Sequence, residues 1–131
     1  MMTKEELINY WVKSSDMDFE TMEFLFSSKR YNWSLFMGHL MIEKLLKAVF
    51  VKNNPDGTST PRIHDLPYLA EKAKLTLTDE KESDLEMITS FQINARYEDF
   101  KFSFYKRCTK EYTTEKINKI RGIRIWLKSL V

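Results

Sequence analysis

The sequence predicts an all-α protein, an antiparallel up-and-down bundle of about four to five helices with one extended segment before the last helix. Apolar residues recur at helical spacing in most of the chain. There are only 3 glycines in 131 residues, fewer than the turns of a sheet protein usually need. A hydrophobic content of 43% and a charged content of 31% are ordinary for a globular protein. We therefore expect one domain over residues 1–131, long enough to bury a core.

The first helix is predicted to begin after Thr3 and to run to about residue 28. Thr3 and Glu6 have the spacing of a capping box, in which each side chain accepts a hydrogen bond from the other's backbone N–H. Asp18 shares a face with Trp11 and other apolar residues. Because an unpaired carboxylate there would be costly, we expect Asp18 to meet a cation or a hydroxyl from another helix.

The central helix is predicted from its apolar surface, which covers most of the circumference between residues 35 and 50. Such a helix must be covered by neighbours, so the rest of the chain is expected to pack around it. Asn32 is the expected N-cap. The helix must end before Pro55, which disfavours helix at the preceding residue, and residues 53–61 form the clearest loop.

Two shorter helices are predicted next. His64 or Asp65 is expected to cap a helix that ends near residue 74, and Thr78 to cap another over about residues 79–94. In the second of these, apolar residues again recur at helical spacing.

Residues 95–107 show no helical period, and phenylalanines alternate from Phe100 to Phe104. That alternation predicts an extended strap across the bundle. Thr113 or Thr114 is expected to cap the last helix. The core stripe of that helix is predicted to be Ile117, Ile120, Ile123, Leu127 and Leu130.

The composition excludes several classes of protein. A single cysteine, Cys108, rules out an internal disulfide framework and suits a reducing compartment. No run of about 18 apolar residues predicts a membrane span, and the charged N-terminus has no signal-peptide pattern. We expect a cytoplasmic protein without a membrane partner. A net charge of +2 does not by itself argue for nucleic-acid binding.

One polar ridge follows the central helix. His39, Glu43 and Lys47 occupy positions i, i+4 and i+8 and therefore lie along one line. The ridge is either an ion pair beside a buried, hydrogen-bonded histidine or the wall of a ligand groove. His39 and Glu43 have the spacing of two metal ligands on a helix, but a zinc site needs a third protein ligand. The sequence nominates none, so no metal site is predicted.

Arg96 stands at a helix end between apolar segments. Guanidinium in such a place serves for bidentate contact with phosphate or carboxylate. The alternative is an intramolecular pair with Asp99, Glu98 or Glu43 that holds the following segment to the bundle. The run from Lys101 to Lys110 is similarly ambiguous, because interleaved aromatic and basic residues either bind single-stranded nucleic acid or face the core.

Three blocks of the sequence resemble the signature of HEPN domains, the "higher eukaryote and prokaryote nucleotide-binding" family. They are His-Leu-x-Ile-Glu-Lys-x-Leu-Lys-Ala at 39–48, His-Asp-Leu at 64–66 and Ala-Arg-Tyr-x-Asp at 95–99. Trp11 with Asp18 also looks like the family. The resemblance covers nearly the whole chain and implies an all-α bundle that commonly dimerises around a shared cleft.

The resemblance implies two functions. Many members are encoded beside, or fused to, a minimal nucleotidyltransferase, and some are metal-independent endoribonucleases and toxins. The ribonuclease site of the family is an Arg followed four to six residues later by a His. This sequence departs from it, since residues 100–103, four to seven positions after Arg96, are Phe, Lys, Phe and Ser, with no histidine.

The leading hypothesis is a non-catalytic homodimeric module. It would bind a nucleotide or a nucleotidyltransferase partner, and the partner could form a toxin–antitoxin pair with it. It would need no cofactor. Arg96 would contact phosphate with help from Lys47, while Glu43 and Asp99 would orient the cations or hydrogen-bond the ligand. Tyr97 completes the expected ligand-binding set.

The alternative is an endoribonuclease with a degenerate site. Arg96 would stabilise the pentacoordinate phosphate of RNA, and His39 or His64 would act as general acid or base. A histidine within reach of Arg96 would favour this reading, and two histidines in the packed core would exclude it. A second alternative is a scaffold that only pairs with another protein.

Overall fold

The structure, a computed structural model, describes the backbone of residues 1–131 and every side chain except those of Glu98 and Asp99. The described backbone forms six helices and no strand, which confirms the all-α class. The helices are α1 (Lys4–Ser27), α2 (Tyr31–Asn53), α3 (Leu66–Lys72), α4 (Asp79–Arg96), α5 (Glu98–Arg107) and α6 (Lys110–Lys128).

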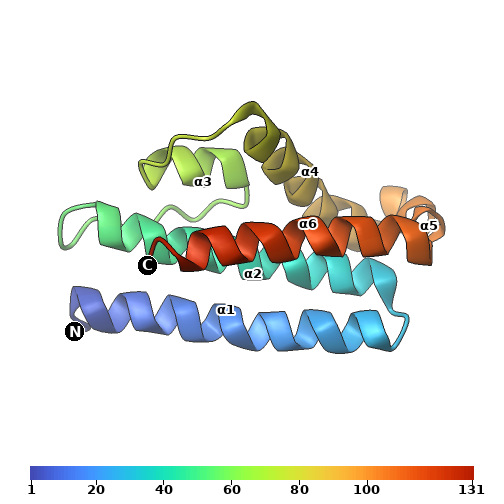
Figure 1. The fold of residues 1–131 in the computed structure, drawn as a ribbon, viewed down its shortest axis with the longest axis horizontal. Coiled ribbons are helices and arrows are strands. Elements are labelled where there is room, and N and C mark those ends of the chain that lie inside the picture. Colours follow the sequence, from blue (N-terminus) through green and yellow to red (C-terminus); the bar gives the residue numbers. More distant parts are fainter.

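Helix α2 is the centre of the bundle, as its apolar surface predicted. It packs against α1, α3, α4, α5 and α6. Helices α1 and α2 form an antiparallel hairpin, and α6 lies beside α2 and runs in the same direction (Figure 1). Helices α3 and α4 cover a further side, and α5 lies at the end of the molecule where α1 turns into α2 (Figure 1). No helix among these is long and apolar enough to cross a membrane.

Side-chain caps begin four of the helices. The capping box of Thr3 and Glu6 is confirmed, with both hydrogen bonds at 3.1 Å. Asp65 accepts from the Tyr68 backbone N–H and caps α3. Thr78 caps α4 in the same way. These caps depend on residues within three positions of one another, which is why the sequence predicts them.

Two predicted caps are wrong. Helix α2 begins one residue before Asn32, with Arg30 at the N-cap position and no side-chain cap. The last helix begins at Lys110 because Thr109, not Thr113 or Thr114, accepts from a first-turn backbone N–H. Thr113 lies fully buried inside that helix.

The predicted extended strap is also wrong, because residues 98–107 form helix α5. Phe104 is fully buried, whereas Phe100 and Phe102 are 50% and 67% exposed, so the alternating phenylalanines do not share a buried face. The buried pair is Phe104 and Cys108, which have helical i, i+4 spacing. Phe104 packs on Phe91 of α4 with ring centroids 5.7 Å apart.

The expected partner of Asp18 is a lysine of α2. Lys44 Nζ lies 2.6 Å from Asp18 Oδ2 and joins α1 to α2. Most of the predicted stripe of α6 is buried, namely Ile117, Ile120, Ile123 and Leu127. Gly38 lets α2 approach α6, since a Cβ there would lie 2.7 Å from Ile120 Cδ1.

Candidate functional site

The polar ridge of α2 meets the loop before α3. Glu43 is only 5% exposed. Its Oε1 lies 2.7 Å from His64 Nδ1, and its Oε2 lies 3.1 Å from Lys47 Nζ. Because a carboxylate only accepts hydrogen bonds, both nitrogens donate to it. We refer to His39, Glu43, Lys47 and His64 as the His64 cluster.

His39 holds the same loop from beneath. It is fully buried, as expected, and its Nε2–H donates to the backbone oxygen of His64 over 3.1 Å. Burial lowers the pKa of His39 from its ordinary value of 6.5, which favours the neutral imidazole. Two side chains of α2, one turn apart, therefore hold both the backbone and the ring of His64.

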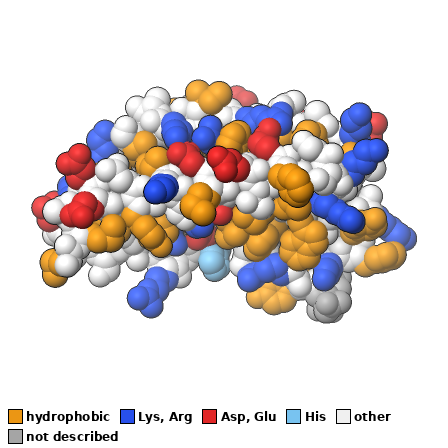
Figure 2. Space-filling model, turned by 90° about the horizontal axis from the view of Figure 1, so that it is seen from below, with side chains coloured by type: hydrophobic (Ala, Val, Ile, Leu, Met, Phe, Trp, Pro, Cys, Tyr) orange, Lys and Arg blue, Asp and Glu red, His pale blue; other side chains and the backbone are white. Residues whose placement is uncertain are grey.

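His64 itself reaches the surface, where its side chain is 55% exposed. Histidine surface is visible in the view of Figure 2. With Nδ1–H bound to Glu43, the neutral ring has its lone pair on Nε2. No described residue hydrogen-bonds to that nitrogen. A carboxylate that orients a histidine whose other nitrogen faces outward is an arrangement suited to proton transfer.

Arg96 ends α4 with an exposed side chain. Its Nε donates to the Gln92 backbone oxygen over 3.3 Å. Its guanidinium carbon lies 5.8 Å from the ring centre of Phe36 and 5.6 Å from that of Tyr97. No carboxylate among the described side chains forms an ion pair with it, so the expected pair with Glu43 is absent from this part of the chain.

The predicted contacts of Asp99 fall outside the described side chains, as do those of Glu98. Tyr97 is 54% exposed and stands between α4 and α5. The terminal nitrogens of Arg96 make no hydrogen bond to any described residue. Arg96 and Tyr97 thus present a cation and an aromatic face to the surface together.

Arg96 and the His64 cluster lie on the same side of α2. Phe36, which packs under Arg96, precedes Glu43 by about 10 Å along the helix axis. The positive charge of Arg96 is near enough to contribute to the lowered pKa of His39, after burial as the main cause. Neither histidine forms a hydrogen bond with Arg96 within the described structure.

Lys47 is mostly enclosed, with its side chain 13% exposed. Its ammonium group pairs with Glu43 and lies 5.1 Å from the ring centre of Trp11. Trp11 and Lys47 also line a pocket of about 630 Å³ together with residues 59–62. The ammonium that the sequence assigns to a ligand phosphate therefore already has a carboxylate partner here.

The described side chains contain no group of three or more His, Cys, Asp or Glu residues arranged to hold a metal ion. The donor nitrogens of His39 and His64 are both engaged in hydrogen bonds inside the cluster.

A comparison with known protein families places these motifs in one family. The family model described as "HEPN domain" matches residues 8–130. The chain belongs to the HEPN family. Neither the curated proteins nor the solved structures gave a match. The HEPN motif blocks at 39–48 and 64–66 form one hydrogen-bonded cluster in the fold, and the block at 95–99 begins beside it.

Sequence reasoning missed the partners that His64 and Arg96 find far away in the chain. It treated His64 as part of a capping turn, whereas His64 is bound by Glu43 across 21 positions of the chain. It did not nominate Phe36 under Arg96. The only signal in the sequence was that Glu43, His64 and Arg96 fall in three motif blocks of one family.

Proposed function

We propose that this HEPN module binds a nucleotide at Arg96. The observation that carries the proposal is the exposed guanidinium of Arg96, which lies 5.8 Å and 5.6 Å from the ring centres of Phe36 and Tyr97 and forms no ion pair with the described side chains. The terminal N–H groups of the guanidinium make no hydrogen bond to a described residue, and their planar fork matches the oxygens of a phosphate. The exposed ring of Tyr97 offers a face to the base.

The roles of the remaining predicted residues change in this proposal. Glu43 and Lys47 support the site by holding His64, rather than contacting the ligand themselves. His64 is then the neighbour that hydrogen-bonds the ligand through Nε2. The setting is a cytoplasmic homodimer or a complex with a minimal nucleotidyltransferase, as in a toxin–antitoxin pair, and family membership supports these partners.

Thermal unfolding with a panel of nucleotides tests the proposal. A nucleotide present at 100 times its dissociation constant stabilises the folded state by about 2.7 kcal/mol, which raises Tm by several degrees. We expect this shift in the wild type and its loss in Arg96→Ala. Arg96→Lys is the matched variant, because it keeps the charge but loses the planar fork.

The outcomes separate the alternatives. A shift of equal size in Arg96→Ala places the nucleotide elsewhere. No shift with any nucleotide rejects the proposal and leaves the protein-interaction scaffold as the function to test by co-purification with the partner protein.

A second candidate function is metal-independent RNA cleavage, and the exposed His64 held by buried Glu43 favours it. His64 would transfer the proton and Arg96 would stabilise the charged phosphate. Cleavage of single-stranded RNA in the presence of EDTA should fall by about 10²-fold or more in His64→Ala. Equal cleavage by the wild type and by His64→Ala would exclude this mechanism.

A further inference from the structure

Helix α2 begins without the cap that most other helices of the chain have. Arg30 occupies the N-cap position, no side chain caps the helix, and its first turn contains no acidic residue. The first N–H groups of a helix lack intrahelical acceptors, and they concentrate partial positive charge. Such an end favours an anion, although by itself it does not identify a site.

A pocket opens at this helix end, against α5. We call it the α5 pocket, and its volume is about 430 Å³. That is within the usual range for small-molecule sites. A second hollow of about 310 Å³ adjoins it. The α5 pocket is lined by three cations, three aromatic rings and one amide, which are Lys29, Arg30, Lys101, Trp33, Phe102, Tyr105 and Asn32.

Asn32 supplies a polar group to the α5 pocket. The residue is only 7% exposed and lines both hollows, yet its side-chain amide hydrogen-bonds no described residue. The amide atoms are not among the fully enclosed polar atoms that lack a hydrogen-bond partner, so they remain accessible from the pocket and free to take one. A ligand in the α5 pocket would provide that partner.

Two of the three aromatic residues of the pocket are largely exposed. Phe102 and Tyr105 are 67% and 63% exposed. Lys101 Nζ lies 5.5 Å from the ring centre of Trp33, and Lys106 Nζ lies 4.7 Å from that of Phe102. Figure 2 shows hydrophobic and basic side chains side by side at this end of the molecule. Exposed rings among cations are the composition that binds bases and phosphates of single strands.

The α5 pocket neighbours the aromatic side chain on which Arg96 packs. Trp33 in the pocket packs edge-to-face on Phe36, with ring centroids 5.8 Å apart. The guanidinium of Arg96 lies 5.8 Å from the ring centre of the same Phe36. The two places are therefore one helical turn apart on α2. A ligand longer than one nucleotide could occupy both at once.

We propose that the α5 pocket binds one nucleotide unit of a single-stranded nucleic acid. The phosphate lies at the N-terminus of α2 with Lys29 and Arg30, and the base stacks on Phe102 or Tyr105. Asn32 hydrogen-bonds the bound unit. This inference rests on the proposed function only in that the next unit of the same strand would bind at Arg96, so the two sites can be tested separately.

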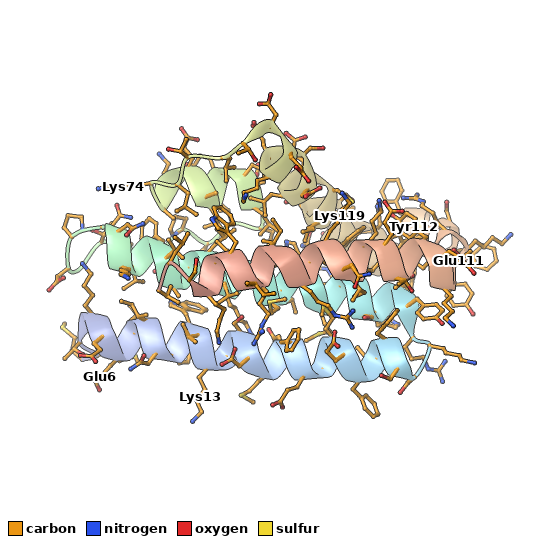
Figure 3. All side chains as sticks on the ribbon, in the orientation of Figure 1. Glu6, Lys13, Lys74, Glu111, Tyr112 and Lys119 are labelled. Carbon is orange, nitrogen blue, oxygen red and sulfur yellow. The ribbon has the colours of Figure 1, made fainter. Side chains whose placement is uncertain are left out.

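A matched pair of lysines makes the test sharp. Lys29 and Lys74 are both exposed, and both have φ of 63°, a left-handed conformation that glycine adopts without steric cost. Lys29→Gly and Lys74→Gly therefore remove the same charge from the same backbone conformation without straining the fold. Lys74 follows α3, at the opposite end of the molecule from α5 (Figure 3).

The measurement is the affinity for a fluorescent single-stranded hexanucleotide, as RNA and as DNA, at several salt concentrations. We expect Lys29→Gly to weaken binding several-fold and to reduce the slope of log K against log salt by about 0.7, the value for one phosphate contact. Lys74→Gly should bind like the wild type. Phe102→Ala should bind the hexanucleotide about tenfold more weakly, because the base loses its stacking partner.

Equal affinity of Lys29→Gly and Lys74→Gly would overturn the inference. So would a Phe102→Ala protein that changes its oligomeric state but not its affinity, because the exposed rings would then form an interface between copies of the chain. Loss of binding in Arg96→Ala alone would reject the α5 pocket and leave the proposed function standing. Loss of binding in Lys29→Gly alone would support the α5 pocket and reject nucleotide binding at Arg96.

Discussion

The two ends of the polar side of α2 differ in how their charges are held. In the His64 cluster, a buried carboxylate accepts from two side chains, and a buried histidine fixes the loop backbone. At the other end, Arg96 and Lys101 lie over aromatic rings and reach the surface. The first arrangement fixes geometry, whereas the second leaves cationic N–H groups for a ligand. From this difference we predict that changes in the cluster affect stability most and that changes at the α5 end affect the proposed binding.

The largest expected effect is at Glu43. Glu43→Ala should destabilise the protein by about 3 kcal/mol, because it removes the shared acceptor of Lys47 and His64 from a buried position. Urea unfolding measures this. Glu23→Ala is the control, since Glu23 makes a more exposed pair with Arg121, worth about 1 kcal/mol or less. Equal losses in the two variants would contradict the contrast between the two regions.

The next effect is a pH dependence that His39 creates. Its pKa in the folded protein lies below the ordinary value of 6.5, because it is buried. As the pH falls below about 6.5, the unfolded chain binds a proton that the folded protein does not, so stability decreases, by up to about 1.4 kcal/mol per pH unit. Above that pH the contribution is fully retained.

His39→Gln isolates this contribution. Glutamine keeps an amide donor for the His64 carbonyl but does not titrate, so its stability should fall less steeply than that of the wild type between pH 6.5 and 5. Chemical denaturation across this pH range compares the two proteins. If the free energies of unfolding of the two proteins fall in parallel with pH, the lowered pKa of His39 does not contribute to the pH dependence of stability.

The smallest expected effect is at Arg96. Arg96→Ala should change the free energy of unfolding by only about 0.5 kcal/mol, since the side chain is exposed and makes one hydrogen bond to a backbone oxygen. The same urea titration measures it. A loss of stability comparable to that of Glu43→Ala would mean that Arg96 holds α4 and α5 together. It would contradict the view that Arg96 contributes little to stability.

The sequence by itself determined the central place of α2, the caps at Thr3 and Thr78, a cap at either His64 or Asp65, and the need for a partner at Asp18. It also predicted a buried His39, and it offered the Glu43–Lys47 ion pair as one of two interpretations of the polar ridge. Each of these follows from residues within one or two helical turns, or from apolar periodicity, so neighbouring side chains are sufficient to predict them.

Only the tertiary structure decided the rest. Residues 98–107 became a helix because Phe104 and Cys108 find a buried surface, a result that a short alternating pattern does not determine. His64 met Glu43, and Arg96 met Phe36, because packing around α2 brings together segments far apart in the chain. Sequence patterns specify which faces are apolar, but which distant side chains meet depends on how those faces pack.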